Sequence, residues 1–148
     1  MNRPRISRWT GTTVIGAAAL ALGALAAAGS IAPAGATPPA YGRLALKVYE
    51  GEAPAGDPIA SADLVCNPDT GTHPDPVAAC AALERAAGDP AKLAGEPGPC
   101  TMEWVPVTVT AEGYWHGGAT HVQFAHTYAN RCDLHRGTTP VFDILEAP

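Results

Sequence analysis

The chain has 148 residues, of which 14 are acidic and nine are lysine or arginine, so its formal net charge is −5 at neutral pH. A surface with this excess of negative charge repels phosphate backbones and anionic lipid, which argues against nucleic-acid and membrane-surface partners. Apart from a leader segment, the length corresponds to one domain that can fold alone and that benefits from cross-links or oligomerisation.

The first 36 residues have the pattern of a cleaved secretory signal peptide. Three arginines and no acids precede or flank an apolar run at 14–28, and Ala-Gly-Ala at 34–36 fits the small-residue cleavage rule. The alternative is a membrane anchor, but this run is shorter than the roughly 20 residues that a spanning helix needs. We expect export and cleavage near residue 36. The product is a single secreted, extracellular domain of residues 37–148, with no membrane partner and, because all 14 acids stay, a net charge near −8.

Two β-strands are predicted at the start of this domain. Residues 43–50 alternate apolar with polar or small side chains, which is typical of a half-buried strand. After the turn-rich segment 51–58, residues 59–66 are predicted as a second strand. The following segment 67–76 is dense in Pro, Gly, Asp and Thr and is expected to be a loop.

One helix is clearly indicated. Asp75 is a suitable N-cap, Pro76 suits the first helical position, and the alanine-rich run that follows contains strong helix formers. Gly88 is expected to stop the helix. Asp89-Pro90 predicts a further single turn that ends by Gly95.

The second half of the domain returns to a period of two residues. A strand is predicted from Val105 to Thr110, then a turn at Glu112-Gly113, then a long strand from Trp115 to about Tyr128. A polar loop is expected after Cys132, and the apolar run 141–145 is predicted as the last strand. About five strands and one good helix, without βαβ alternation, predict an α+β fold in which a helix covers one face of an antiparallel sheet.

All four cysteines lie in the secreted domain. In an oxidising compartment an even number predicts two disulfides, although their spacing alone leaves the connectivity open. Oxidised cysteines cannot act as nucleophiles, and Ser61 is the only serine of the mature chain and lies mid-strand. Neither a carboxylate pair nor a phosphate-binding glycine loop stands out. The chain is therefore not expected to be an enzyme.

Five histidines remain as possible metal ligands, at positions 73, 116, 121, 126 and 135. His121 and His126 are five residues apart on a predicted strand, so they are expected on opposite faces. No pair has the spacing of a helical or strand metal motif. Solvated or hydrogen-bonded histidines are favoured, and no metal or cofactor is expected.

The segment PCTMEWVP at 99–106 is unusual because it combines loop residues with large apolar side chains. Its cysteine tethers it and its prolines restrict the backbone toward extended geometry. A rigid, extended and exposed segment can bind in a protease cleft as a substrate does, with little loss of entropy. Met102 would then occupy an apolar specificity pocket. The alternative is that Met102 and Trp104 begin the next strand and are buried in the core.

Several short motifs occur in a fixed order along the mature chain. They are LVC at 64–66, GTHP at 71–74, P-x-A-A-C-A-x-L at 76–83, C-x-M at 100–102, G-x-W-x-G at 113–117, N-x-C at 130–132 and VF at 141–142. With four cysteines and a signal peptide, this set resembles the Streptomyces-type subtilisin inhibitor-like family from about residue 43 to residue 142.

The resemblance implies a five-stranded antiparallel sheet covered by one long and one short helix, with disulfides Cys66–Cys80 and Cys100–Cys132. It also implies a homodimer formed through sheet packing. The implied activity is inhibition of secreted serine endopeptidases of the subtilisin or chymotrypsin type by the substrate-like standard mechanism.

The resemblance further implies roles for individual residues. Met102 is the primary-specificity residue, Met102–Glu103 is the reactive bond, and Asn130 supports the loop from behind. The other expected enzyme contacts are Pro99, Cys100, Thr101, Trp104 and Val105. Gly71, Thr72, His73 and Pro74 correspond to the family's secondary contact and support region.

Two residues depart from the family pattern. Position 103 is usually apolar or uncharged, and position 99 often carries a larger apolar residue, so Glu103 and Pro99 are expected to affect target choice. One alternative is an extracellular binding or structural protein that kept the fold and lost inhibition. Another is a secreted metal-dependent hydrolase that uses the histidines.

Overall fold

The computed structural model describes residues 40–145. The signal peptide predicted at 1–36 and the first residues of the mature domain lie outside this range. Among the residues described, no helix has the length and apolar character needed to cross a membrane.

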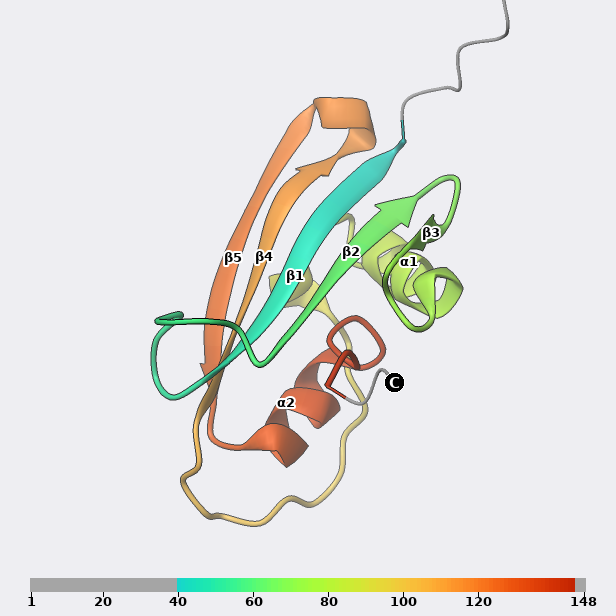
Figure 1. Ribbon diagram of the computed structural model, residues 1–148. Helices are drawn as coiled ribbons and strands as arrows, with labels where there is room; N and C mark the ends of the chain where they lie inside the picture. The colour runs from blue at the N-terminus through green and yellow to red at the C-terminus, as the bar shows by residue number, and fades with distance from the viewer. Residues whose placement is uncertain (1–39, 146–148) are drawn as a thin grey trace, which may run out of the picture. The chain divides into compact units, whose positions relative to one another are not determined.

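A single antiparallel sheet of five strands forms the body of the structure (Figure 1). The strand order is β3-β2-β1-β4-β5, so the first strand of the domain lies at the centre. The strands are β1 (Gly42–Glu50), β2 (Ala60–Cys66), β3 (Thr70–Gly71), β4 (Val107–Trp115) and β5 (Thr120–Tyr128).

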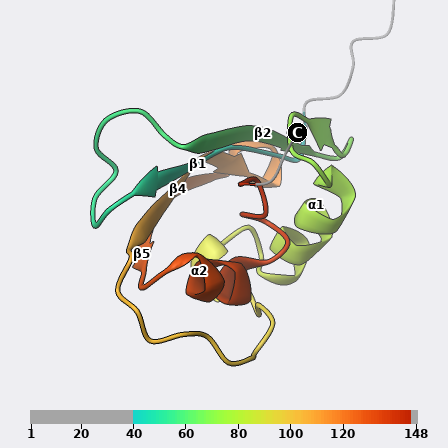
Figure 2. The ribbon, with the colours of Figure 1, turned by 60° about the horizontal axis from the view of Figure 1, so that its bottom comes forward.

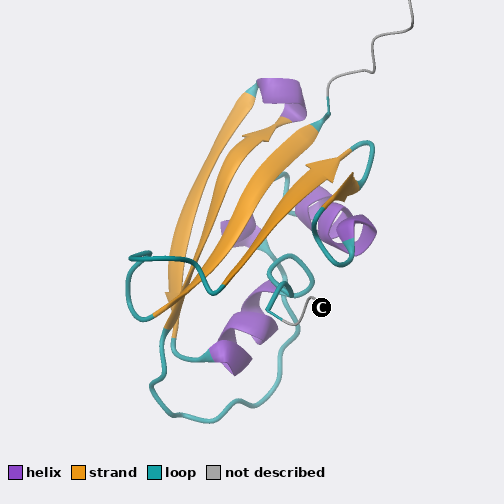
Figure 3. Cartoon of the chain, in the orientation of Figure 1, coloured by secondary structure: helices purple, strands orange, loops and turns teal. Residues whose placement is uncertain are grey.

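Helices cover only one face of this sheet, as the turned view in Figure 2 shows. The helices are α1 (Pro76–Arg85), α2 (Arg131–Thr138) and the short 3₁₀ turns η1 (Pro90–Lys92) and η2 (His116–Gly118). Figure 3 shows how much of the remaining chain is loop, including the whole connection from η1 to β4. The predicted α+β fold, with one long and one short helix, is confirmed.

The core lies between the sheet and the helices. Along β1 the buried positions alternate at Leu44, Leu46 and Val48, and the register places Leu46 opposite Ala62 on β2 and Ala111 on β4. Alternate residues of a strand point to the same face, so these side chains form one apolar layer. The face away from the helices carries mostly polar or small residues.

Helix α1 begins as expected. Asp75 is its N-cap and accepts a hydrogen bond from the Ala78 backbone N–H at 3.0 Å, and Pro76 occupies the first helical position. The helix ends at Arg85, and the left-handed residue that stops it is Ala87, with φ +55°, rather than Gly88. The Gly88 N–H donates to the Leu83 carbonyl at 2.8 Å and completes the C-terminal cap. The disulfide Cys66–Cys80 joins α1 to the end of β2.

The predicted turn at Glu112-Gly113 is wrong, because β4 runs through both residues to Trp115. A Cβ at residue 113 would meet the Arg43 carbonyl oxygen of β1, so the glycine permits a close approach of two strands rather than a turn. The chain reverses at η2 instead, and β5 begins at Thr120.

Two further predictions in the C-terminal part are wrong. The polar stretch after Cys132 belongs to helix α2, which runs from Arg131 to Thr138, rather than to a loop, and the run 141–145 forms consecutive turns rather than a strand. Val141, Phe142 and Ile144 are nevertheless buried in the core. A short apolar run does not distinguish a strand from another buried segment. The fifth strand is the two-residue β3, which lies in the segment predicted as a loop.

Candidate functional site

Residues 99–106, here called the tethered loop, form an irregular segment between η1 and β4. In Figure 1 the connection from η1 to β4 passes along the lower end of the molecule, beyond α2. Met102 is fully exposed, with a relative accessibility of 102%, and Trp104 is 62% exposed. The interpretation that both residues enter the core is wrong, because β4 begins only at Val107, which is the first buried position.

The N-terminal side of the tethered loop is attached to α2. Cys100 forms a disulfide with Cys132 in the first turn of this helix, which confirms the predicted pairing. Upstream, the Glu96 backbone N–H donates to the Arg136 carbonyl at 2.7 Å. A Cβ at residue 95 would meet this same carbonyl group, so the glycine there allows the chain to lie close to the helix.

The C-terminal side is attached to the sheet. The Val105 N–H donates to the Ala129 carbonyl at 2.9 Å, and the Gly51 N–H donates to the Pro106 carbonyl at 2.9 Å. These bonds extend the ladders that β4 forms with its two neighbours. The segment that follows Met102 therefore has a backbone fixed by two strands.

Asn130 supports the centre of the tethered loop. Its side-chain amide donates to the carbonyl oxygens of Thr101 and Glu103, at 3.1 Å each. These two carbonyl groups belong to the residues on either side of Met102. Asn130 is 5% exposed, so water competes little for these bonds. One buried side chain thus fixes the backbone on both sides of the fully exposed Met102.

The position of Asn130 is itself determined by α2. Asn130 is the N-cap of this helix, and its side-chain oxygen accepts from the Asp133 backbone N–H at 3.0 Å. The amide oxygen therefore caps the helix while the amide nitrogen holds the loop. This division uses both N–H donors of the amide and one of the two acceptor positions on its oxygen.

Two side chains of the tethered loop also form hydrogen bonds. The Thr101 hydroxyl donates to the Glu103 carboxylate at 3.4 Å, which spans the Met102 backbone. The Trp104 indole N–H donates to a Glu52 carboxylate oxygen at 3.1 Å. Glu52 was not predicted as part of the site, because nothing in the turn-rich segment 51–58 indicates its proximity to a residue 52 positions later.

The structure does not bring Gly71–Pro74 to the tethered loop through a hydrogen bond. Thr72 bonds to Asp63, and the His73 ring nitrogen Nε2 lies 3.0 Å from the Val141 carbonyl. Both views place β3 at the opposite end of the sheet from this loop (Figures 1 and 2). A role of these four residues in loop support stays a prediction.

A metal site is not indicated within residues 40–145. One group of three potential ligands lies close together there, namely Cys66, Asp69 and Cys80. The two sulfur atoms of this group are joined in a disulfide, and a metal requires thiolates. His121 and His126 lie on β5 at positions that face opposite sides of the sheet.

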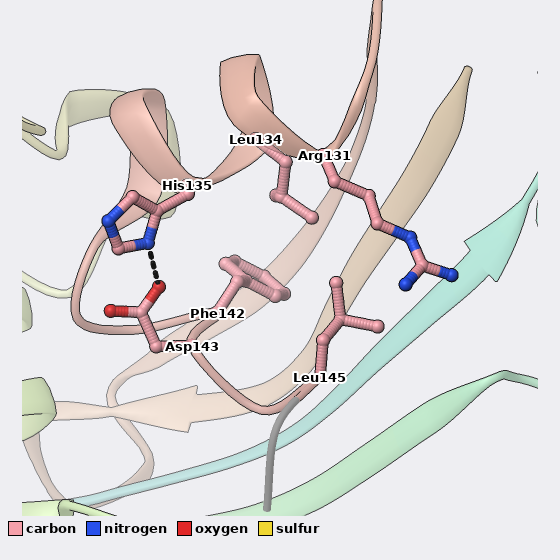
Figure 4. Close-up of a pocket in the computed structure, with 6 residues that line it drawn as sticks. All are labelled: Arg131, Leu134, His135, Phe142, Asp143 and Leu145. Atoms are coloured by element: carbon pink, nitrogen blue, oxygen red, sulfur yellow. Dashed lines mark hydrogen bonds and ion pairs between the residues drawn. The ribbon is translucent and has the colours of Figure 1, made fainter. Parts of the chain in front are cut away.

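A cavity of about 430 Å³ lies beneath α2 (Figure 4). His135 and Asp143 meet at its wall with an Nδ1 to Oδ1 distance of 2.8 Å. A histidine–carboxylate pair needs a nucleophile to resemble a hydrolase triad. None of the lining residues is a serine, cysteine or threonine, so this pair is a structural link between α2 and the C-terminal turns. The lining residues are Arg131, Leu134, His135, Phe142, Asp143 and Leu145.

Comparison with known proteins places this geometry in a family. The family model for subtilisin inhibitor-like domains matches residues 40–130. A subtilase-type protease inhibitor of Streptomyces coelicolor is 42% identical over 102 residues, which are 67% of this chain and 69% of that protein. Subtilisin inhibitor-like protein 2 of Streptomyces rochei is also 42% identical over 102 residues, and the match covers 88% of that protein.

A solved structure agrees with this assignment. The chain superimposes on Streptomyces caespitosus sermetstatin, determined in complex with Bacillus licheniformis subtilisin, with a TM-score of 0.60 and 33% sequence identity. The match covers 68% of this chain and 96% of the other. The protein belongs to the subtilisin inhibitor-like family.

Proposed function

We propose that the protein is a secreted inhibitor of serine proteases of the subtilisin and chymotrypsin type. The tethered loop would bind in the protease cleft as a substrate does, with the Met102 side chain in the primary specificity pocket and Met102–Glu103 as the reactive bond. The observation that carries this proposal is the fully exposed Met102 between two carbonyl groups that buried Asn130 holds.

The attachments on the two sides of Met102 explain how a substrate-like segment can inhibit. A flexible peptide loses conformational entropy when it enters a cleft, whereas a segment held in its bound shape loses little. After attack on the Met102 carbonyl, the new ends would both stay in place. One is held through Cys100 and α2, and the other through Val105 and β5. The leaving amine then remains near the acyl group, so the peptide bond re-forms.

Methionine at position 102 selects the class of target. Its unbranched apolar side chain fits the hydrophobic pockets of subtilisin-like and chymotrypsin-like enzymes. Trypsin-like enzymes have an acidic pocket that prefers a cation. The flanking contacts proposed for Pro99, Cys100, Thr101, Trp104 and Val105 follow from their exposure or partial exposure on the same loop.

Secretion and dimerisation are part of the same proposal. The N-terminal pattern of residues 1–36 supports export. A homodimer is supported by the face of the sheet that no helix covers in Figure 2. Along this face the register aligns the small side chains of Thr110 and Ala125, which a second sheet could approach, beside Lys47 of β1.

The decisive test measures inhibition of subtilisin and chymotrypsin by the wild type and by Met102→Asp. A carboxylate in an apolar pocket is left unpaired, so we expect the inhibition constant to rise by about a thousandfold or more. Met102→Lys is expected to gain inhibition of trypsin. An unchanged constant in Met102→Asp would exclude Met102 as the specificity residue.

Mass spectrometry after incubation with subtilisin distinguishes inhibition from loss of function. A stable complex, with slow cleavage confined to Met102–Glu103, supports the proposal. Rapid cleavage at this bond without inhibition would instead support an extracellular binding protein that kept the fold. Glu103 would then be the residue responsible for the loss of inhibition.

A further inference from the structure

The aromatic side chain of the tethered loop, Trp104, is held by a residue of another loop. Trp104 donates its indole N–H to Glu52, which lies between β1 and β2. An indole has one donor and no acceptor, so this single bond determines which edge of the ring faces the protein. Because the ring is 62% exposed, the rest of its surface is free for a partner.

Exposed apolar side chains are concentrated at this place. Six large hydrophobic residues are exposed among those described, and three of them are Met102, Trp104 and Val105. Single exposed hydrophobic residues are common and need no explanation, whereas a contiguous group indicates a binding surface. Tryptophan is enriched among the residues that dominate the energy of protein interfaces.

The backbone of Glu52 is fixed by two hydroxyl groups, which limits the positions that its exposed carboxylate can reach. The Thr108 hydroxyl donates to the Gly51 carbonyl at 2.8 Å, and the Thr127 hydroxyl donates to the Glu52 carbonyl at 3.3 Å. The two hydroxyl oxygens also lie 2.8 Å apart. A pair of threonines on β4 and β5 thus attaches the start of the β1–β2 loop to the sheet.

We propose that Glu52 is a positioning residue for protease binding, which acts by pre-orienting the Trp104 ring toward the leaving-group side of the target's cleft. This inference rests on the proposed function, because Trp104 is the second residue after the reactive bond. The partner surface that fits is an apolar wall on that side of the cleft. A side chain that is already ordered loses less entropy on binding, so removal of Glu52 weakens the complex without changing the contacts themselves.

The experiment measures the inhibition constant toward Bacillus licheniformis subtilisin for the full secreted chain and five variants. Glu52→Ala removes the acceptor and is expected to weaken inhibition by about fivefold to tenfold. Glu52→Gln keeps a side-chain oxygen at the same place and should restore inhibition to within about twofold of the wild type. The control is Asp57→Ala, which removes an exposed carboxylate of the same loop and should leave inhibition unchanged.

A double-mutant cycle tests whether Glu52 acts through Trp104. Trp104→Phe keeps an aromatic ring but has no N–H, so Glu52→Ala should have no further effect in that background. The inference is overturned if Glu52→Ala inhibits as the wild type does. It is also overturned if the effect persists in Trp104→Phe, or if Asp57→Ala weakens inhibition equally. The proposed function fails separately, through wild-type protein that does not inhibit or through Met102→Asp that still does.

Discussion

The two disulfides lie in different surroundings: one is in the packed core and the other attaches an exposed loop. Cys66–Cys80 joins β2 to α1, and both cysteines are buried, at 4% and 5% exposure. Cys100–Cys132 joins the tethered loop to α2, and both cysteines are half-buried. The first cross-link connects two elements that already pack in the core. The second fixes a segment with almost no buried side chains, so it supplies order that packing cannot.

Chain entropy alone does not show this difference. The bridges span 14 and 32 residues, which correspond to about 3 and about 3.7 kcal/mol of stabilisation in the entropic model. By this measure they are similar. Their surroundings nevertheless predict different effects. Loss of the second bridge should mainly weaken inhibition, and loss of the first should mainly lower the free energy of unfolding.

The largest expected effect comes from removing the second bridge with Cys100→Ala/Cys132→Ala. The N-terminal side of the tethered loop becomes free to move, so we expect the inhibition constant toward subtilisin to rise by about a hundredfold or more, with faster cleavage at Met102–Glu103. Inhibition assays and mass spectrometry check this. Inhibition equal to the wild type would show that hydrogen bonds to α2 suffice to order the loop.

Removal of the first bridge is expected to affect stability instead. In Cys66→Ala/Cys80→Ala the free energy of unfolding should fall by about 3 kcal/mol. Inhibition at a temperature where the variant is folded should stay within about twofold of the wild type. Urea denaturation followed by circular dichroism gives the first quantity. A large loss of inhibition in folded protein would contradict the separation of the two regions.

A smaller effect is expected at Asn130, where one side chain serves both the helix and the loop. Asn130→Asp keeps the oxygen that caps α2 and loses the donor to Thr101 and Glu103. Asp and Asn are equally good N-caps, but the buried carboxylate would face two carbonyl oxygens, so we expect a modest fall in the unfolding temperature. The inhibition constant should rise by about thirtyfold, which corresponds to two lost hydrogen bonds of about 1 kcal/mol each. A large fall in the unfolding temperature would mean that the loop contacts stabilise the fold.

The smallest effect concerns Tyr128, which lies beneath α2 and contacts Gly137. Burial raises the pKa of the Tyr128 phenol, with a smaller contribution from the charge of Asp133. The folded state therefore keeps this proton at a pH where the unfolded chain, with its ordinary pKa near 10, has lost it. Stability should fall as the pH rises above 10, and Tyr128→Phe should lessen this fall. Thermal unfolding between pH 9 and pH 11 checks the difference, with Tyr114→Phe as the control.

The sequence was sufficient to predict those strands and helices whose local signals agree with the tertiary structure. Alternation predicted β1 and β2, and Asp75-Pro76 predicted the start of α1. Helix α2 was missed because His, Gly and Thr in it are weak helix formers, and the Asn130 cap was assigned to loop support alone. The exposed position of Met102 also did not follow from local pattern, which allowed a buried strand equally well.

Only those residues of the candidate site that are consecutive in the sequence could be predicted from local pattern. The residues of the tethered loop are consecutive, so their motif indicates them directly, and the match to Asn130 came from resemblance. Glu52 and Ala129 contact the loop through the sheet register, which places the ends of β1, β4 and β5 together. No single-sequence signal reports such a long-range contact, because the spacing between the partners is set by strand pairing.

The close packing of residues 95–98 on α2 has a practical consequence for engineering. A Cβ at Gly95 would collide with the Arg136 carbonyl group, so this position tolerates no side chain, whereas at Gly98 it would meet only the movable Arg136 guanidinium. The side chains at 101, 102 and 105, in contrast, make no buried contact and extend into solvent. A combinatorial library confined to these three positions would sample new target preferences on an unchanged backbone, and its members should fold with nearly the same yield.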